Sequence, residues 1–298
     1  MNYNKLTKKQ SGLIFLMVYG FSFLLGLIII LGWKDKVEIL WLMLFADIIM
    51  TIAIYFIGII LKNASLYDPY WSVVPIYIIL IWLVVYGLSF DVYNIILLVL
   101  ILIWGIRLTY NWWKNWHGFS TQDWRYDMLR EKNTKLYPIT NFFGIHMIPT
   151  LVVYIQMINV YRSLNSSLIN LIVFVVGVLL CLFAPVIQFI SDRQMFNFRL
   201  NNKGKLKVIN TGLWRFSRHP NYFAELMFWV GIYVIYLSKS MKFDINIIYP
   251  ILMILLFVFI SIPMMENKIK NREGYEDYKS SVSVLFPFPQ KKNWKTPR

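Results

Sequence analysis

Long apolar segments alternate with short polar ones along the whole chain of 298 residues. A helix needs roughly 17 to 25 residues to cross a hydrocarbon core about 30 Å thick, and the apolar segments match or approach that length. They do not show the two-residue alternation of a lipid-spanning strand, and a backbone in lipid must satisfy its own hydrogen bonds. The pattern predicts eight membrane-spanning helices, at 11–32, 39–61, 72–88, 92–106, 141–160, 168–190, 222–237 and 247–264.

Composition supports a membrane protein and excludes a soluble domain and a disordered chain. Hydrophobic residues make up 58% of the chain and charged residues 15%, whereas a soluble domain carries about 25% charged residues. Aromatic residues make up 18%, which excludes a disordered chain. The first apolar run is too long for the core of a signal peptide, and no small-residue cleavage site follows it. We therefore predict an all-α, polytopic integral membrane helix bundle.

The basic residues predict how the helices are oriented. The chain has 30 Lys and Arg against 15 Asp and Glu, a net charge of +15. If the N-terminus is cytoplasmic, 25 of the 30 basic residues fall in cytoplasmic segments, where Lys and Arg are enriched. Both termini are then cytoplasmic, and the charge reflects topology and attraction to anionic lipid or an anionic ligand. The positive charge therefore does not require a nucleic-acid partner to explain it.

We predict a single membrane domain over residues 1–298. Its N-terminal helices occupy 11–110, and a Trp-rich interfacial loop follows at 111–140. The second half covers 141–287, and a flexible basic tail covers 288–298. The single cysteine, Cys181, allows no disulfide within one chain.

Polar and charged residues are most concentrated between Gln188 and Glu225. If the sixth helix continues past the interface, Gln188, Asp192 and Arg199 share one face. Pro220 can sit in the first turn of the next helix, with Asn221 and Glu225 four residues apart on one side. A carboxylate inside the membrane needs a partner or a polar cavity, which makes Glu225 a functional candidate.

A second interpretation of these residues stays open. The arginines can be anchors on the cytoplasmic side, and His219 can be a solvated loop residue. Glu225 can be the ion-pair partner of a neighbouring arginine. The arginines concerned are Arg193, Arg199, Arg215 and Arg218.

The segment 211–225, with sequence TGLWRFSRHPNYFAE, resembles the C-terminal domain of the steroid 5-alpha-reductase family. It is most similar to a bacterial branch long known only as a domain of unknown function. The resemblance extends from 67 to 287. It also rests on Asp192-Arg-Gln with Arg199, on Asp68-Pro-Tyr-Trp-Ser72, on Trp104-Gly-Ile-Arg107-Leu-Thr-Tyr110, and on Arg272-Glu-Gly-Tyr275-Glu-Asp-Tyr278.

The resemblance implies a membrane-embedded reductase that transfers hydride from NADPH to a carbon-carbon double bond of a steroid or other lipid enone. Substrate would come from the bilayer, to a cavity lined by the helices of 11–110, and the cofactor site in 141–287 would face the cytoplasm. Arginine donors suit phosphates, while Asn and carboxylates suit a carboxamide or ribose hydroxyls. The implied cofactor-binding residues are Asp192, Arg193, Arg199, Arg218, His219, Asn221, Tyr222, Glu225 and Tyr278.

The reaction also needs a group that hydrogen-bonds or protonates the carbonyl as charge develops. Asp68, Tyr70 and Tyr110 are the catalytic candidates, although Asp68 can equally cap the turn before Pro69 within an aromatic belt. Asp47 and His146, each inside an apolar span, can either face the same cavity or be satisfied by neighbouring helices.

Two further functions remain as alternatives. The Arg-His-Pro turn is also similar to that of membrane methyltransferases of the isoprenylcysteine carboxyl type, which use S-adenosylmethionine. A non-catalytic lipid-binding membrane protein is the second alternative. A metal site is not expected, because three histidines and one cysteine are widely separated in the sequence.

Overall fold

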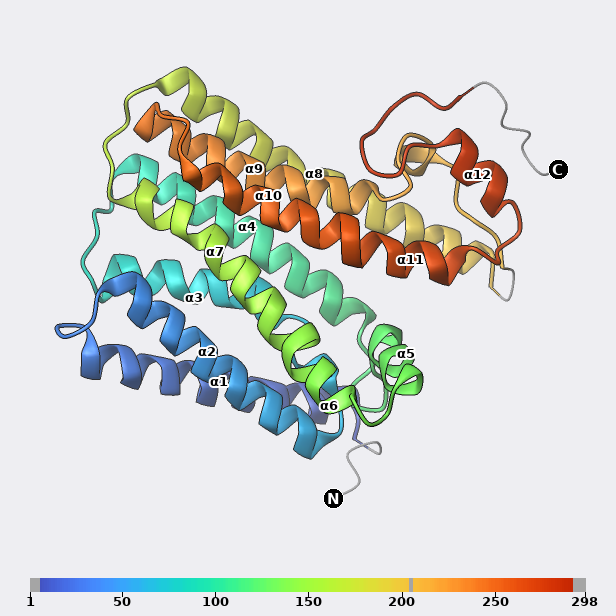
Figure 1. Cartoon of the computed structure of the whole chain (residues 1–298), viewed down its shortest axis with the longest axis horizontal. Coiled ribbons are helices and arrows are strands. Elements are labelled where there is room, and N and C mark those ends of the chain that lie inside the picture. The colour runs from blue at the N-terminus through green and yellow to red at the C-terminus, as the bar shows by residue number, and fades with distance from the viewer. Residues whose placement is uncertain (1–5, 204–205, 292–298) are drawn as a thin grey trace. The chain divides into compact units, whose positions relative to one another are not determined.

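The computed structural model describes residues 6–203 and 206–291 (Figure 1). This part of the chain is mostly helical, and its only β-type pairing is an isolated parallel bridge between Lys207 and Glu273. The chain divides into two compact units, residues 1–165 and 166–298. Residues 292–298 of the predicted basic tail lie outside the described residues.

Unit 1 contains five long helices and the interfacial segment. α1 packs on α2, α3 packs on α4 and α7, and α2 also contacts α7. Its elements are α1 (Lys8–Trp33), α2 (Ile39–Leu61), the 3₁₀ turn η2 (Ala64–Leu66), α3 (Tyr70–Val84), α4 (Val92–Asn115), α5 (Trp124–Lys132), α6 (Tyr137–Ile139), the π-helix η3 (Thr140–Met147) and α7 (Ile148–Leu164).

Caps in the sequence explain where the long helices of unit 1 begin. Thr7 and Gln10 form a capping box at the start of α1. The Glu38 carboxylate accepts from the Leu40 backbone N–H at 3.1 Å before α2, and Asp91 caps α4 in the same way.

Unit 2 contains the second half of the chain. α8 and α9 pack closely, and α10 packs on α9 (Figure 1). Its elements are α8 (Leu171–Asn201), the 3₁₀ turn η4 (Gly212–Arg215), α9 (Pro220–Ser240), the 3₁₀ turn η5 (Ile245–Ile247), α10 (Ile248–Leu256), the π-helix η6 (Phe257–Ser261), α11 (Ile262–Ile269) and α12 (Tyr275–Ser281).

Glycines bring the backbones of α8 and α9 into contact. A Cβ on Gly231 would lie 2.6 Å from Cys181 Sγ, and one on Gly177 would lie 2.8 Å from the Ile235 backbone nitrogen. Small residues at such crossings let membrane helices approach closely. Cys181 is consequently buried, with its thiol directed at the Phe228 carbonyl oxygen at 3.5 Å.

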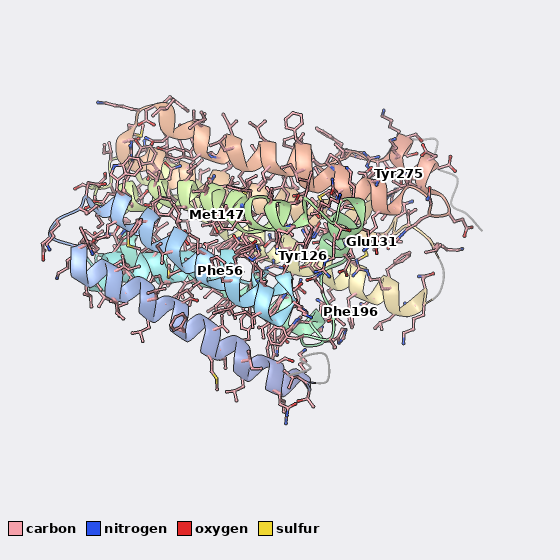
Figure 2. All side chains as sticks on the ribbon, turned by 60° about the horizontal axis from the view of Figure 1, so that its bottom comes forward. Phe56, Tyr126, Glu131, Met147, Phe196 and Tyr275 are labelled. Carbon is pink, nitrogen blue, oxygen red and sulfur yellow. The ribbon has the colours of Figure 1, made fainter. Side chains whose placement is uncertain are left out.

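Seven helical segments of the described chain are long and apolar enough to cross a membrane. They match seven of the eight predicted runs, and the protein is an all-α, multi-pass membrane protein. The remaining run, predicted at 222–237, forms α9 but is not among the seven, because its polar side chains lower its mean hydropathy. Large apolar side chains face outward along the spans, for example Phe56 with 58% exposure (Figure 2).

Several helices extend beyond the predicted runs. The run predicted at 92–106 continues to Asn115, and the run predicted at 168–190 continues to Asn201. Charged residues end an apolar run, but helical hydrogen bonding continues through them at the interface. Within the predicted loop 111–140, α5 forms a nine-residue helix capped by Asp123.

The orientation of the helices can be measured with reporter fusions. With α9 as a spanning helix, we expect a fusion after Lys242 to be active only on the outer face. Fusions after Lys207 and Lys279 should be active only in the cytoplasm, as the positive-inside distribution requires. An inside signal after Lys242 would mean that α9 does not cross and would contradict the prediction of eight spans.

Candidate functional site

A polar part of unit 2 is formed where α8 extends past its apolar segment. At 31 residues α8 is about 46 Å long, which exceeds the ~30 Å hydrocarbon core. This confirms that the predicted sixth helix continues past its apolar run. After a loop and the η4 turn, Pro220 begins α9, and the Phe223 N–H donates to the His219 carbonyl oxygen at 3.0 Å.

Glu225 is buried on α9 and has polar partners. One carboxylate oxygen accepts from Gln188 Nε2 at 2.7 Å, and the other accepts from Trp229 Nε1 at 2.9 Å. Glu225 is 3% exposed and Gln188 2%. Gln188 Oε1 is buried and has no hydrogen-bond partner among the described residues. The expectation that Glu225 would have a partner is therefore met by an amide and an indole.

Glu266, on α11, is the centre of a second polar cluster. Its carboxylate accepts from His219 Nε2 at 2.8 Å and from Tyr275 Oη at 2.5 Å, and it forms an ion pair with Arg218 at 3.4 Å. We call these four residues the Glu266 cluster. The cluster joins the start of α9 to α11 and α12 (Tyr275 is labelled in Figure 2).

Glu266 lies outside every motif of the sequence that points to the site. It follows the last apolar run by only two residues, so the argument applied to Glu225, that a carboxylate at membrane depth needs partners, could have found it. Its partners His219 and Tyr275 belong to two separate motifs, at 211–225 and 272–278.

Hydrogen bonds connect α12 and the segment after it to η4 and to the Arg-His-Pro turn. Tyr278 Oη donates to the Trp214 carbonyl oxygen at 2.7 Å, and the Arg218 N–H donates to the Ser283 carbonyl oxygen at 2.8 Å. Burial raises the pKa of Tyr278 and of Tyr275. Both phenols therefore remain neutral hydrogen-bond donors at physiological pH.

A basic surface lies where α8 ends. Arg193 and Arg199 are exposed, and Asp192 is half-buried. Burial and then the positive charge of Arg199 lower the pKa of Arg272, which is the direction that repulsion between two guanidinium groups gives. An anion placed there would relieve that repulsion.

The remaining predicted cofactor residues occupy different environments. Arg218 and His219 are buried, at 8% and 3% exposure, within the Glu266 cluster. Asn221 and Tyr222 are half-buried, and the rings of His219 and Tyr222 stack with centroids 5.1 Å apart. The structure thus gathers Arg218 and His219 on Glu266, places Glu225 with Gln188, and leaves Arg193 and Arg199 at the surface.

The predicted catalytic residues of unit 1 have different partners and different exposure. Asp68 accepts a hydrogen bond from the Tyr126 hydroxyl, and Trp112 Nε1 donates to it at 3.4 Å (Tyr126 is labelled in Figure 2). Burial and then the charge of Asp68 raise the pKa of Tyr126. Tyr70 donates instead to Asp47, at 2.7 Å, while Tyr110 is 63% exposed on α4.

Seven long apolar helices among the described residues, with buried carboxylates between helices, define a multi-pass membrane protein. The chain belongs to the family described as "Protein of unknown function (DUF1295)", which matches residues 54–282. No group of metal-ligating side chains is found among the described residues.

One curated relative is similar to the chain over part of its length. It is an uncharacterized protein of Schizosaccharomyces pombe, 26% identical over 200 residues. The match covers 58% of this chain and 57% of that protein. No solved structure matches the chain.

Proposed function

We propose that the protein is a membrane-embedded, NADPH-dependent reductase of the steroid 5-alpha-reductase type. It would transfer hydride to a carbon-carbon double bond of a steroid or other lipid enone. The observation that carries this proposal is the buried Gln188–Glu225 pair, because Glu225 ends the segment that carries the resemblance and Gln188 Oε1 has no partner among the described residues. The basic surface near Arg199 supports it.

The residues of unit 2 fit a nicotinamide dinucleotide phosphate. Gln188 Oε1 is a buried acceptor with no partner among the described residues and suits the N–H donors of a carboxamide. Arg199 and Arg272, which repel each other, suit phosphate oxygens. When bound, NADPH supplies the hydride.

The other polar side chains would orient groups and hold protons. Glu266 holds Arg218 and His219, so it fixes the start of α9, the helix that carries Asn221 and Glu225. In unit 1, Tyr126 or Tyr70 would hydrogen-bond the substrate carbonyl as negative charge develops on its oxygen. Asp68 and Asp47 orient these two phenols through the hydrogen bonds they accept.

The reaction can be followed with deuterated NADPH and the protein in lipid nanodiscs. With a steroid 4-en-3-one as substrate, we expect deuterium at the β carbon, a solvent proton at the α carbon, and one NADP⁺ per product. Mass spectrometry of the steroid measures this. The Glu225→Gln variant should slow the reaction, and Arg130→Ala, which changes an exposed residue of α5, serves as the control.

The same preparation distinguishes the alternatives. Transfer of a labelled methyl group from S-adenosylmethionine to a prenyl-cysteine or lipid acceptor, without deuteride transfer, would replace the reductase by a methyltransferase. If neither NADPH nor S-adenosylmethionine binds, a non-catalytic lipid-binding protein is the remaining function.

A further inference from the structure

An apolar surface outside the membrane-spanning helices lies in unit 2, on the segment that follows α12. Phe286 and Phe288 are 59% and 61% exposed, and Phe216, in the turn before α9, is 40% exposed. Residues 282–291 form a loop beside the start of α9 (Figure 1). We call this loop, together with Phe216, the Phe loop. Exposed apolar side chains that gather on one surface mark places where a protein meets an apolar partner.

Hydrogen bonds hold the backbone of the Phe loop in place. Ser217 Oγ donates to the Leu285 carbonyl oxygen at 2.7 Å, and the Phe288 N–H donates to the Phe216 carbonyl oxygen at 3.1 Å. The Leu285 side chain is buried. Because the backbone is fixed and Leu285 points inward, the fold itself directs the phenylalanine rings outward.

The contacts between α8 and α9 give the level of this loop along the helices. The two helices run in opposite directions, and Gln188 of α8 donates to Glu225 of α9. Phe223, two residues before Glu225, therefore lies about 3 Å farther toward the end of the apolar run of α8, near Ile190. The rings of Phe223 and Phe286 meet edge to face, with centroids 5.9 Å apart. With α8 as a spanning helix, Phe286 is level with the boundary between acyl chains and headgroups.

The backbone of the loop can enter that boundary at little cost. Unpaired N–H groups make irregular backbone unfavourable near lipid. Pro287 and Pro289 have no N–H, and the N–H of Phe288 is already paired with a carbonyl oxygen. Three of the four residues from 286 to 289 therefore bring no free N–H toward the lipid.

The charge of the loop matches an anionic membrane surface. Segments 211–217 and 282–291 contain no acidic residue, whereas Arg215 and Lys291 are exposed. Basic residues beside exposed aromatic rings are typical of segments that lie in the interface of anionic membranes. The level of Phe286 favours lipid over a soluble protein, which would have to displace the headgroups to reach that ring.

We propose that the Phe loop inserts into the leaflet beside the end of the apolar run of α8. Its three phenylalanine rings lie among the upper acyl chains, and its two cations lie at anionic phospholipid headgroups. Arg218 is hydrogen-bonded to the loop and ion-paired with Glu266, so the insertion fixes the Glu266 cluster relative to the membrane surface. The proposal does not depend on the reductase activity, because it concerns attachment to lipid.

Photocrosslinking tests the insertion in the full-length protein. The photoreactive residue p-benzoylphenylalanine, which resembles phenylalanine in shape, takes the place of Phe286 or of Phe288. In nanodiscs of phosphatidylcholine and phosphatidylglycerol, we expect several-fold more lipid adduct at either position than at Glu276, an exposed position of α12 that serves as the matched control. Mass spectrometry of the irradiated protein measures the adducts.

Two results would overturn the insertion. One is lipid adduct at 286 and 288 no greater than at 276, which would leave the loop in water. The other is a crosslinked dimer in place of lipid adducts, because a second copy of the chain would then cover the surface. The variant at 288 keeps the contact between Phe286 and Phe223, so it decides the question if the variant at 286 is unstable.

A charge variant tests the headgroup contacts. A basic residue near an anionic surface should enrich phosphatidylglycerol among the adducts about fivefold over its share of the bilayer, equivalent to about 1 kcal/mol. Arg215→Gln combined with Lys291→Gln should abolish this enrichment, whereas Lys242→Gln, an exposed lysine just past the other end of α9, should keep it. Undiminished enrichment in the double variant would contradict the assignment of these two cations to headgroups.

Discussion

The Glu266→Gln variant is expected to lose about 3 kcal/mol of unfolding free energy, because removing one partner of a buried ion pair leaves the other charge uncompensated. Arg218 would be that charge, since its side chain is 9% exposed and its ion-pair partner is Glu266. His219 and Tyr275 would also lose a charged acceptor. Urea unfolding in a mild detergent, followed by tryptophan fluorescence, measures the effect.

The matched control for this variant is Glu273→Gln, seven residues after Glu266. Glu273 pairs with Lys207 at 3.8 Å, and its side chain is 62% exposed. Exposed pairs contribute about 0 to 1 kcal/mol, so this variant should unfold almost as the parent does. Equal losses in the two variants would mean that the Glu266 cluster does not hold the start of α9.

The second large effect is expected on NADPH binding. A hydrogen bond to a charged group is worth about 1.5 to 3 kcal/mol, so losing one should weaken binding by about one to two decades. Arg199→Ala should show this, together with a weaker dependence of affinity on salt, because a phosphate contact is lost. Asn221→Ala and Glu225→Gln should lose affinity without that change in salt dependence. Titration by tryptophan quenching in detergent gives the affinities.

The control for these variants is Arg130→Ala, which removes an exposed arginine of unit 1 packed over the Tyr137 ring. It should bind NADPH as the parent does. If Arg199→Ala, Asn221→Ala and Glu225→Gln all bind normally while folded, these residues do not form the cofactor site.

The helices were predictable because each span is a continuous apolar run. The ends of the helices were harder to predict. In α8, for example, the apolar run stops near Ile190, but the helix continues for another eleven residues to Asn201. The η3 π-helix was not predicted, since a change from α- to π-type hydrogen bonding leaves the apolar pattern of the sequence intact.

The polar partners were harder to predict than the polar residues themselves. Periodicity along one helix places Glu225 and Asn221 on one side, but it carries no information about which side chain of another helix they meet. His219 and Glu266 are 47 positions apart, and Asp47 and Tyr70 lie on different helices. Such pairs are set by how helices pack, so the sequence indicated candidates and the structure supplied their contacts.

The tight crossing of α8 and α9 has a practical consequence for experiments. Cys181 is the single thiol of the chain, and it is buried between these helices. Water-soluble maleimides should therefore leave the folded parent protein unmodified. The natural sequence can then serve directly as a background for cysteine-scanning, in which thiols introduced one at a time at Lys242 or Lys279 report which side of the membrane each position faces.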